Sequence, residues 1–236
     1  MLFRQLFDTD TSTYTYLVGD ERTHEAVVID PVLERVDEVL AAAEELGLTI
    51  VWSMETHVHA DHVTAGGTLR ERMGIRVAFP ARANGCGCAD LTLADGDEVR
   101  VGDVVLMVLE TPGHTSDSVS FLIPGKMIFT GDALLVGTCG RTDFQNGDPG
   151  ALYDSIHGKL FPLADDVVVW PGHDYAGQTR TTIGAERTGN KRAAGRTRDE
   201  FIALMRSLSL PRPRRMDEAV PANLRCGIGD VPHTAG

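Results

Sequence analysis

Three histidines and one aspartate lie within six consecutive residues of this 236-residue chain. The segment is THVHADH, and its ionisable side chains are those of His57, His59, Asp61 and His62. Gathering such groups is unfavourable unless a cation accepts their lone pairs, and imidazole nitrogens and carboxylate oxygens are common ligands of divalent metals. The cluster therefore predicts a metal site.

Three further short segments supply candidate ligands downstream. They are TPGHT, TGD and PGHD, which contain His114, Asp132 and His173, and each follows a predicted strand. Residues that follow successive strand ends can meet at the same edge of a sheet, so we expect these side chains to lie beside the THVHADH segment.

The ligand set alone leaves the number of metals open. A pair of metals is the hydrolytic arrangement, in which the cations lower the pKa of a bridging water. In that case the ligands are His57, His59 and His114 for one metal, Asp61, His62 and His173 for the other, and Asp132 as the bridge. A single metal held by fewer of these residues leaves coordination positions open for other reactants.

The segments around these motifs alternate between strand and helix patterns. Strand-forming runs are TYTYLVG, EAVVIDP, LTIVWSM, IRVAF, EVRVGD, VVLMVLE, SVSFLI, KMIFTGD and VVVW. Apolar residues recur at helical spacing from Val32 to Leu46, residues 149–159 also favour a helix, and little periodicity remains from about Met216. This mixture predicts a layered α/β (α+β) sandwich that forms a single domain over residues 1–236, with a C-terminal helix and tail from about residue 190.

The composition argues against several classes of partner. The net charge of −12 repels nucleic acid, and the basic stretch from Arg187 to Arg215 is interleaved with acidic residues and proline, as in a solvated helix and linker. No apolar run is long enough to cross a bilayer, and the first residues lack the apolar core of a signal peptide. We therefore expect a cytoplasmic protein that binds neither nucleic acid nor membranes.

The cysteine spacing supports no disulfide scaffold and no structural zinc site. The four cysteines are Cys86, Cys88, Cys139 and Cys226, and none forms a CxxC pair. We interpret Cys86 and Cys88, in the segment GCGC, as free thiols in a loop, with a redox or metal role as the alternative. Cys139 has no activating neighbour in sequence, so a structural or modulatory role is expected.

The motifs THVHADH, PGHT, TGDALL and PGHD, in this order, resemble the metallo-β-lactamase superfamily. That resemblance spans residues 1 to about 190 and implies an αββα sandwich with the metal site at one edge. Within the superfamily, the segments TGDALLVGTCGRTDFQ and AVPANLRCG are similar to the persulfide dioxygenases related to the ethylmalonic encephalopathy protein. They cover the C-terminal half, including the tail without periodicity.

The resemblance implies one Fe(II) per chain, held by His57, His114 and Asp132. It also implies that glutathione persulfide and O2 react there to give sulfite and glutathione, and it suggests a homodimer. The remaining candidates would orient those ligands or hold an alternative second metal; they are His59, Asp61, His62 and His173. The competing interpretation is a glyoxalase II-like dinuclear hydrolase of glutathione thioesters.

Three residues are candidates for holding the substrate. Arg141 suits a carboxylate of glutathione, although an ion pair with Asp143 explains it equally well. Tyr175 follows the last metal motif, and Arg225 reaches the site if the tail folds back. Packing or tethering roles are the alternatives for both.

Overall fold

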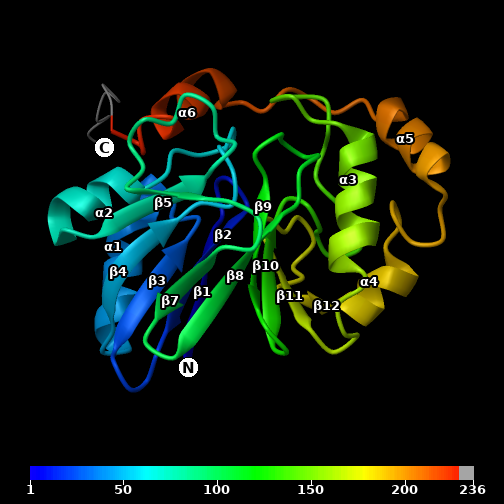
Figure 1. Cartoon of the computed structure of the whole chain (residues 1–236). Helices are drawn as coiled ribbons and strands as arrows, with labels where there is room; N and C mark the ends of the chain where they lie inside the picture. Colours follow the sequence, from blue (N-terminus) through cyan, green and yellow to red (C-terminus); the bar gives the residue numbers. More distant parts are fainter. Residues whose placement is uncertain (229–236) are drawn as a thin grey trace.

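Two six-stranded sheets form the centre of the computed structural model, which describes residues 1–228 (Figure 1). The first sheet has the strand order β1 (Leu2–Asp8), β2 (Thr13–Gly19), β3 (Glu25–Ile29), β4 (Thr49–Met54), β5 (Arg76–Pro80) and β6 (Leu91–Leu93). The second has the order β12 (Thr181–Thr182), β11 (Val168–Pro171), β10 (Met127–Gly131), β9 (Val119–Ile123), β8 (Val104–Glu110) and β7 (Glu98–Val101). Each sheet mixes parallel and antiparallel pairs.

The two sheets bury one apolar layer between them. Alternate residues of each strand point into it, including Tyr16 and Val18 from β2 and Phe121 and Phe129 from β9 and β10. Because successive side chains of a strand point to opposite faces, the intervening residues are free to contact helices. Residues such as Leu17 do so on the outer face of the first sheet.

Helices cover both outer faces. The first sheet carries α1 (Val36–Glu45) after a short 3-10 turn (Leu33–Arg35), and α2 (Gly66–Met73). The second sheet carries α3 (Pro149–Ser155), its π-helical continuation (Ile156–Leu160), α4 (Ile183–Gly189) and α5 (Arg198–Ser207). The predicted αββα sandwich is therefore confirmed. No helix in residues 1–228 is long and apolar enough to cross a membrane.

The C-terminal tail differs from its sequence-based expectation. Residues Met216–Asn223 form a helix, α6, above the sheet edge that carries the histidine segment (Figure 1). Its buried residues are Ala219, Ala222 and Asn223. Two alanines and an asparagine make no recognisable apolar stripe, which is why the sequence showed no helical periodicity there.

The interpretation of Cys88 as a free thiol is wrong. Cys88 forms a disulfide with Cys226, 138 residues later in the chain, while Cys86 and Cys139 remain free. The pairing depends on α6 folding back over the first sheet. Sequence spacing alone carries no information about such a contact.

Candidate metal centre

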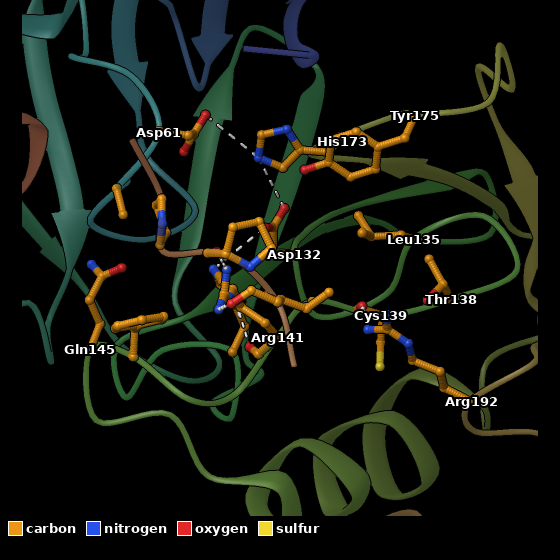
Figure 2. Close-up of a pocket in the computed structure, with 17 residues that line it drawn as sticks. Asp61, Asp132, Leu135, Thr138, Cys139, Arg141, Gln145, His173, Tyr175 and Arg192 are labelled. Carbon is orange, nitrogen blue, oxygen red and sulfur yellow. Dashed lines mark hydrogen bonds and ion pairs between the residues drawn. The ribbon is translucent and has the colours of Figure 1, made fainter. Parts of the chain in front are cut away.

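The candidate ligands lie together at the edge of the sandwich where several strands end. Figure 2 shows three of them, Asp61, Asp132 and His173, side by side. The histidine segment follows β4, His114 lies in the β8–β9 loop, and Asp132 and His173 follow β10 and β11. The two sheets thus contribute to one site. The convergence expected from the strand ends is present.

One group of ligands comprises His57, His114 and Asp132, whose donor atoms lie within 4.8 Å of one another. His114 Nε2 is 3.4 Å from Asp132 Oδ2. The other carboxylate oxygen, Asp132 Oδ1, is buried and accepts no hydrogen bond from the described residues. An unsatisfied buried oxygen is unfavourable, and a cation would satisfy it. The donor set therefore fits a divalent metal.

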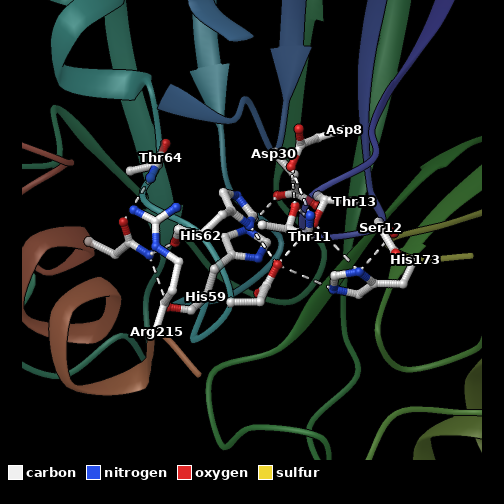
Figure 3. Close-up of polar contacts among 12 residues, drawn as sticks. Asp8, Thr11, Ser12, Thr13, Asp30, His59, His62, Thr64, His173 and Arg215 are labelled. Carbon is white, nitrogen blue, oxygen red and sulfur yellow. Dashed lines mark hydrogen bonds and ion pairs between the residues drawn. The ribbon is translucent and has the colours of Figure 1, made fainter. Parts of the chain in front are cut away.

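Hydrogen bonds donated by Nδ1 orient three of the histidine rings. His57 Nδ1 donates to Thr56 Oγ1 (2.9 Å), since that hydroxyl itself donates to Asp30 Oδ2. His114 Nδ1 donates to the Arg141 carbonyl (2.7 Å) and His173 Nδ1 to the Ser12 carbonyl (3.0 Å; Figure 3). In each ring the Nδ1 proton leaves the Nε2 lone pair available to a metal.

A second group comprises His59, Asp61 and His62. Asp61 Oδ2 accepts hydrogen bonds from Thr13 Oγ1 (2.9 Å) and His62 Nδ1 (2.8 Å). Two nitrogens of the group, His59 Nδ1 and His62 Nε2, are buried and have no hydrogen-bond partner within residues 1–228. The geometry therefore retains the ligands of a second metal.

Two carboxylates stabilise a positive charge on the buried His59 ring. His59 Nε2 lies 3.1 Å from Asp30 Oδ1 (Figure 3) and 3.3 Å from Glu55 Oε2. Burial disfavours the charged form of His59, but these two carboxylates outweigh it and raise the pKa of the ring well above its ordinary value. His57 lacks such a partner, so burial lowers its pKa well below the usual range.

His173 connects the two groups. Its Nε2 lies 3.6 Å from Asp132 Oδ1 and 3.7 Å from Asp61 Oδ2. Burial of Asp61 opposes its ionisation, yet His62 and His173 reverse this effect and hold its pKa well below the ordinary value. All seven metal-ligand candidates therefore form one continuous cluster.

Glycines allow the ligand loops to approach other backbone closely. At Gly131, with a φ of +48°, a Cβ would lie 2.5 Å from Thr56 Oγ1. At Gly113, with a φ of +137°, a Cβ would lie 2.3 Å from the Leu152 backbone. Residues with side chains fit neither position, so these two glycines determine where Asp132 and His114 lie.

The helix α6 holds the histidine segment from outside. Asn223 is fully buried, and its Nδ2 donates to the carbonyls of His59 and His62, both at 2.9 Å. Its Oδ1 accepts from the Thr64 amide (2.8 Å). The Asn223 side chain therefore ties the C-terminal tail to the backbone of the metal-ligand loop, and we call this contact the Asn223 clamp.

A pocket of about 470 Å³ opens beside the ligands (Figure 2). Its walls include Asp61, His114, Asp132 and His173, together with apolar side chains such as Leu135. One wall is the crossing segment, residues 208–215, which links α5 to α6 and contributes Leu210, Pro211 and Pro213. The pocket can take a ligand larger than a diatomic gas.

The three substrate candidates lie in different surroundings. Arg141 lines the pocket, forms a two-point ion pair with Asp143 (2.7 and 2.8 Å) and donates to the Pro211 carbonyl (2.6 Å). Tyr175 also lines the pocket, is 74% exposed and stacks on the His173 ring. Arg225 is exposed at the end of α6, outside the residues that line the pocket.

Known proteins are similar to this one over almost the whole chain. The sequence model of the Metallo-beta-lactamase superfamily matches residues 89–173. The mitochondrial persulfide dioxygenase ETHE1 of Mus musculus is 44% identical over 98% of this chain and 91% of its own length, and that of Homo sapiens is 44% identical over 97% and 89%. The crystal structure of ETHE1 from Myxococcus xanthus is 56% identical, with a TM-score of 0.94 over 97% of this chain and all of that one.

The chain belongs to the ETHE1 persulfide dioxygenase family. This confirms both levels of the resemblance found in the motifs, the superfamily and the persulfide dioxygenases within it. The segment AVPANLRCG, one of those that indicated the ETHE1 family, contains the Asn223 clamp and Cys226.

Several residues of this ETHE1-family site were not anticipated from the sequence. Asp30 and Glu55 each directly follow a strand, so the strand-end argument that found Asp132 would also have found them. Arg192, which lines the pocket and donates to the Cys139 carbonyl (2.6 Å), and Thr13 carried no such pattern. Contacts between distant segments place both.

Proposed function

We propose that this protein is a persulfide dioxygenase that converts glutathione persulfide, O2 and water into glutathione and sulfite. The observation that carries the proposal is the His57, His114 and Asp132 group beside an open pocket, in a chain of the ETHE1 family. Two histidines and one carboxylate on one side of a cation leave its other positions open to a sulfur ligand and to dioxygen.

We propose one Fe(II) as the metal at this site. Iron supplies the one-electron chemistry with dioxygen that zinc lacks. The protein supplies oriented Nε2 lone pairs on His57 and His114 and the unsatisfied oxygen of Asp132. His57 is almost fully buried, whereas His114 and Asp132 line the pocket, so reactants would approach the metal from the pocket side.

The other four ionisable residues act on the ligands indirectly in this proposal. His59 pairs with the carboxylates of Asp30 and Glu55, and Asp61 accepts a hydrogen bond from Thr13. These contacts fix the histidine segment that carries His57. His62 then positions Asp61, and His173 lies between Asp61 and Asp132.

Glutathione carboxylates would meet positive charge on one side of the pocket. We propose that Arg141 and Arg192 provide it, because both guanidinium groups belong to residues that line the pocket. Arg141 already holds the crossing segment through the Leu210 and Pro211 carbonyls. It therefore also shapes the pocket wall. Tyr175 would cover the open side, whereas Arg225 would act on the tail.

The second candidate function is a dinuclear hydrolase of glutathione thioesters. The observation in its favour is the intact His59, Asp61 and His62 group, with buried unpartnered nitrogens. Two metals there would supply a hydroxide near neutral pH. Only the loaded metals and the reaction distinguish this candidate from the dioxygenase.

Metal content and oxygen uptake test the proposal together. Protein loaded anaerobically with Fe(II) should hold about one iron per chain and consume oxygen only when glutathione persulfide is added. Asp132→Asn is the matched variant, which removes one ligand oxygen at nearly constant volume. Two zincs per chain with hydrolysis of S-lactoylglutathione and no oxygen uptake would refute the dioxygenase.

We also propose a cytoplasmic location and a homodimer. Both rest on the sequence and the resemblance, and the mammalian relatives are named as mitochondrial proteins. Cell fractionation tests the first. Sedimentation of the metal-loaded protein tests the second.

A further inference from the structure

Three cysteines meet at the junction between the C-terminal tail and the loop after β5. The Cys88–Cys226 disulfide joins the two segments, and the free thiol of Cys86 lies 3.6 Å from Cys88 Sγ. All three sulfur atoms lie within 4.8 Å of one another. A free thiol in contact with a disulfide is the arrangement from which thiol–disulfide exchange begins.

The surroundings of Cys86 suit a nucleophile that moves. The Cys88 and Ala89 amides donate hydrogen bonds to its sulfur, which stabilise a thiolate, although burial raises the pKa of the thiol overall. Gly85 and Gly87 flank it, and added side chains there would meet nothing closer than 3.8 Å. The backbone on either side of Cys86 is therefore free to rotate, and such a rotation would move Cys86 from its contacts with the apolar cluster around Phe79 into line with the disulfide.

The cysteine that would be released, Cys226, is held in an unfavourable backbone conformation. Cys226 is completely buried and has a φ of +57°, which residues with side chains rarely adopt. Besides the disulfide, its carbonyl accepts from the Gly67 amide (2.7 Å) and its amide donates to the Asn223 carbonyl (2.9 Å). Such a conformation persists only while its neighbours enforce it.

We propose that Cys86, Cys88 and Cys226 form a thiol–disulfide exchange site that releases the C-terminal tail from the first sheet. The Cys86 thiolate attacks Cys88 Sγ, a Cys86–Cys88 bond forms, the Cys88–Cys226 bond breaks, and Cys226 leaves as a thiolate that takes up the proton. One disulfide is present before and after, so no external oxidant or reductant is consumed.

The exchange reaches the metal-ligand loop through Asn223. This residue lies three positions before Cys226 and bonds to the carbonyls of His59 and His62. With the covalent anchor gone, the backbone strain at Cys226 can relax. The clamp on the histidine segment then opens more often.

Tryptic peptides distinguish the two disulfide isomers. Cleavage after Arg82, Arg100 and Arg225 yields fragment 83–100, with Cys86 and Cys88, and fragment 226–236, with Cys226. The full protein with its disulfide intact, held at neutral pH without added oxidant or reductant, is quenched with acid, alkylated and digested without reduction. We expect two populations. In one, the fragments are linked and Cys86 is alkylated; in the other, fragment 83–100 carries an internal disulfide and Cys226 is alkylated.

Two cysteine variants serve as a matched pair. Cys86→Ser should show only the linked fragments, whereas Cys139→Ser, which changes the other free cysteine, should show both isomers as in the unmodified protein. Cys226→Ser should form the internal Cys86–Cys88 disulfide. In that variant the Thr64 and Gly67 amides should exchange hydrogen about tenfold faster than in the unmodified protein.

The proposal fails if fragment 83–100 never carries the internal disulfide in the unmodified protein. It also fails if Cys86→Ser gives the same isomers as Cys139→Ser, or if hydrogen exchange at Thr64 and Gly67 is unchanged in Cys226→Ser. Because these measurements need no catalysis, they are independent of the proposed dioxygenase activity.

Discussion

Replacing Asn223 with alanine tests whether the C-terminal tail supports the metal centre. The change removes three buried hydrogen bonds, two to the carbonyls of His59 and His62 and one from the Thr64 amide. Each buried group left without its partner costs about 1–3 kcal/mol, so leaving three groups unpaired should lower the free energy of unfolding by at least about 3 kcal/mol.

The metal should also be lost more readily from the Asn223→Ala protein. Groups that orient a ligand loop are worth about 10–100-fold in metal affinity, and Asn223 holds the backbone on both sides of Asp61. Urea denaturation gives the stability, and competition with a chelator gives the affinity. Both should be measured on iron-loaded and metal-free protein.

Asn190→Ala is the matched control. Asn190 is also buried and donates to the Thr138 carbonyl and to Glu186, away from the histidine segment. The Asn190→Ala substitution should lower the free energy of unfolding by a similar amount and leave the affinity of the protein for iron unchanged. Equal losses of iron affinity in both variants would refute the clamp, since general destabilisation would then explain the result.

Three further substitutions test the site and its supports. Asp132→Asn should reduce persulfide-dependent oxygen uptake at least about 100-fold, because even groups that only orient a metal ligand are worth about 10–100-fold; normal uptake with bound iron would contradict the ligand assignment. Arg141→Lys loses the two-point pairing with Asp143, so KM for glutathione persulfide should rise about tenfold at unchanged kcat in steady-state assays. Gly113→Ala places a Cβ against the Leu152 backbone and should destabilise the fold by about 3 kcal/mol or more in urea titration. An unchanged KM or an unchanged unfolding midpoint would refute the respective argument.

The strand pattern made most of the sandwich and the ligand convergence predictable. Alternating or continuous apolar runs mark strands, and ionisable residues directly after β4, β10 and β11 therefore had to meet at one edge. Strand β1 was missed, although it pairs with β2 along its whole length. Its side chains are mostly half-buried, so its apolar pattern is weak.

What the sequence did not reveal depends on contacts between distant segments. Asn223 lies more than 150 residues from the carbonyls that it binds, and Cys88 lies 138 residues from Cys226. No local spacing encodes such pairs. The same holds for the crossing segment, whose apolar side chains line the pocket and whose carbonyls accept hydrogen bonds from Arg141, about 70 residues earlier in the chain.

The metal ligands come from both halves of the molecule. His57 follows a strand of the first sheet, whereas His114 and Asp132 belong to the second, and a cation bound by all three joins the halves as a cross-link does. Metal binding and the free energy of unfolding of the domain are then thermodynamically linked. At a free metal concentration of 100 times Kd, binding adds about 2.7 kcal/mol to the stability of the fold. A substitution that only loosens the packing between the sheets therefore weakens metal retention without touching a ligand.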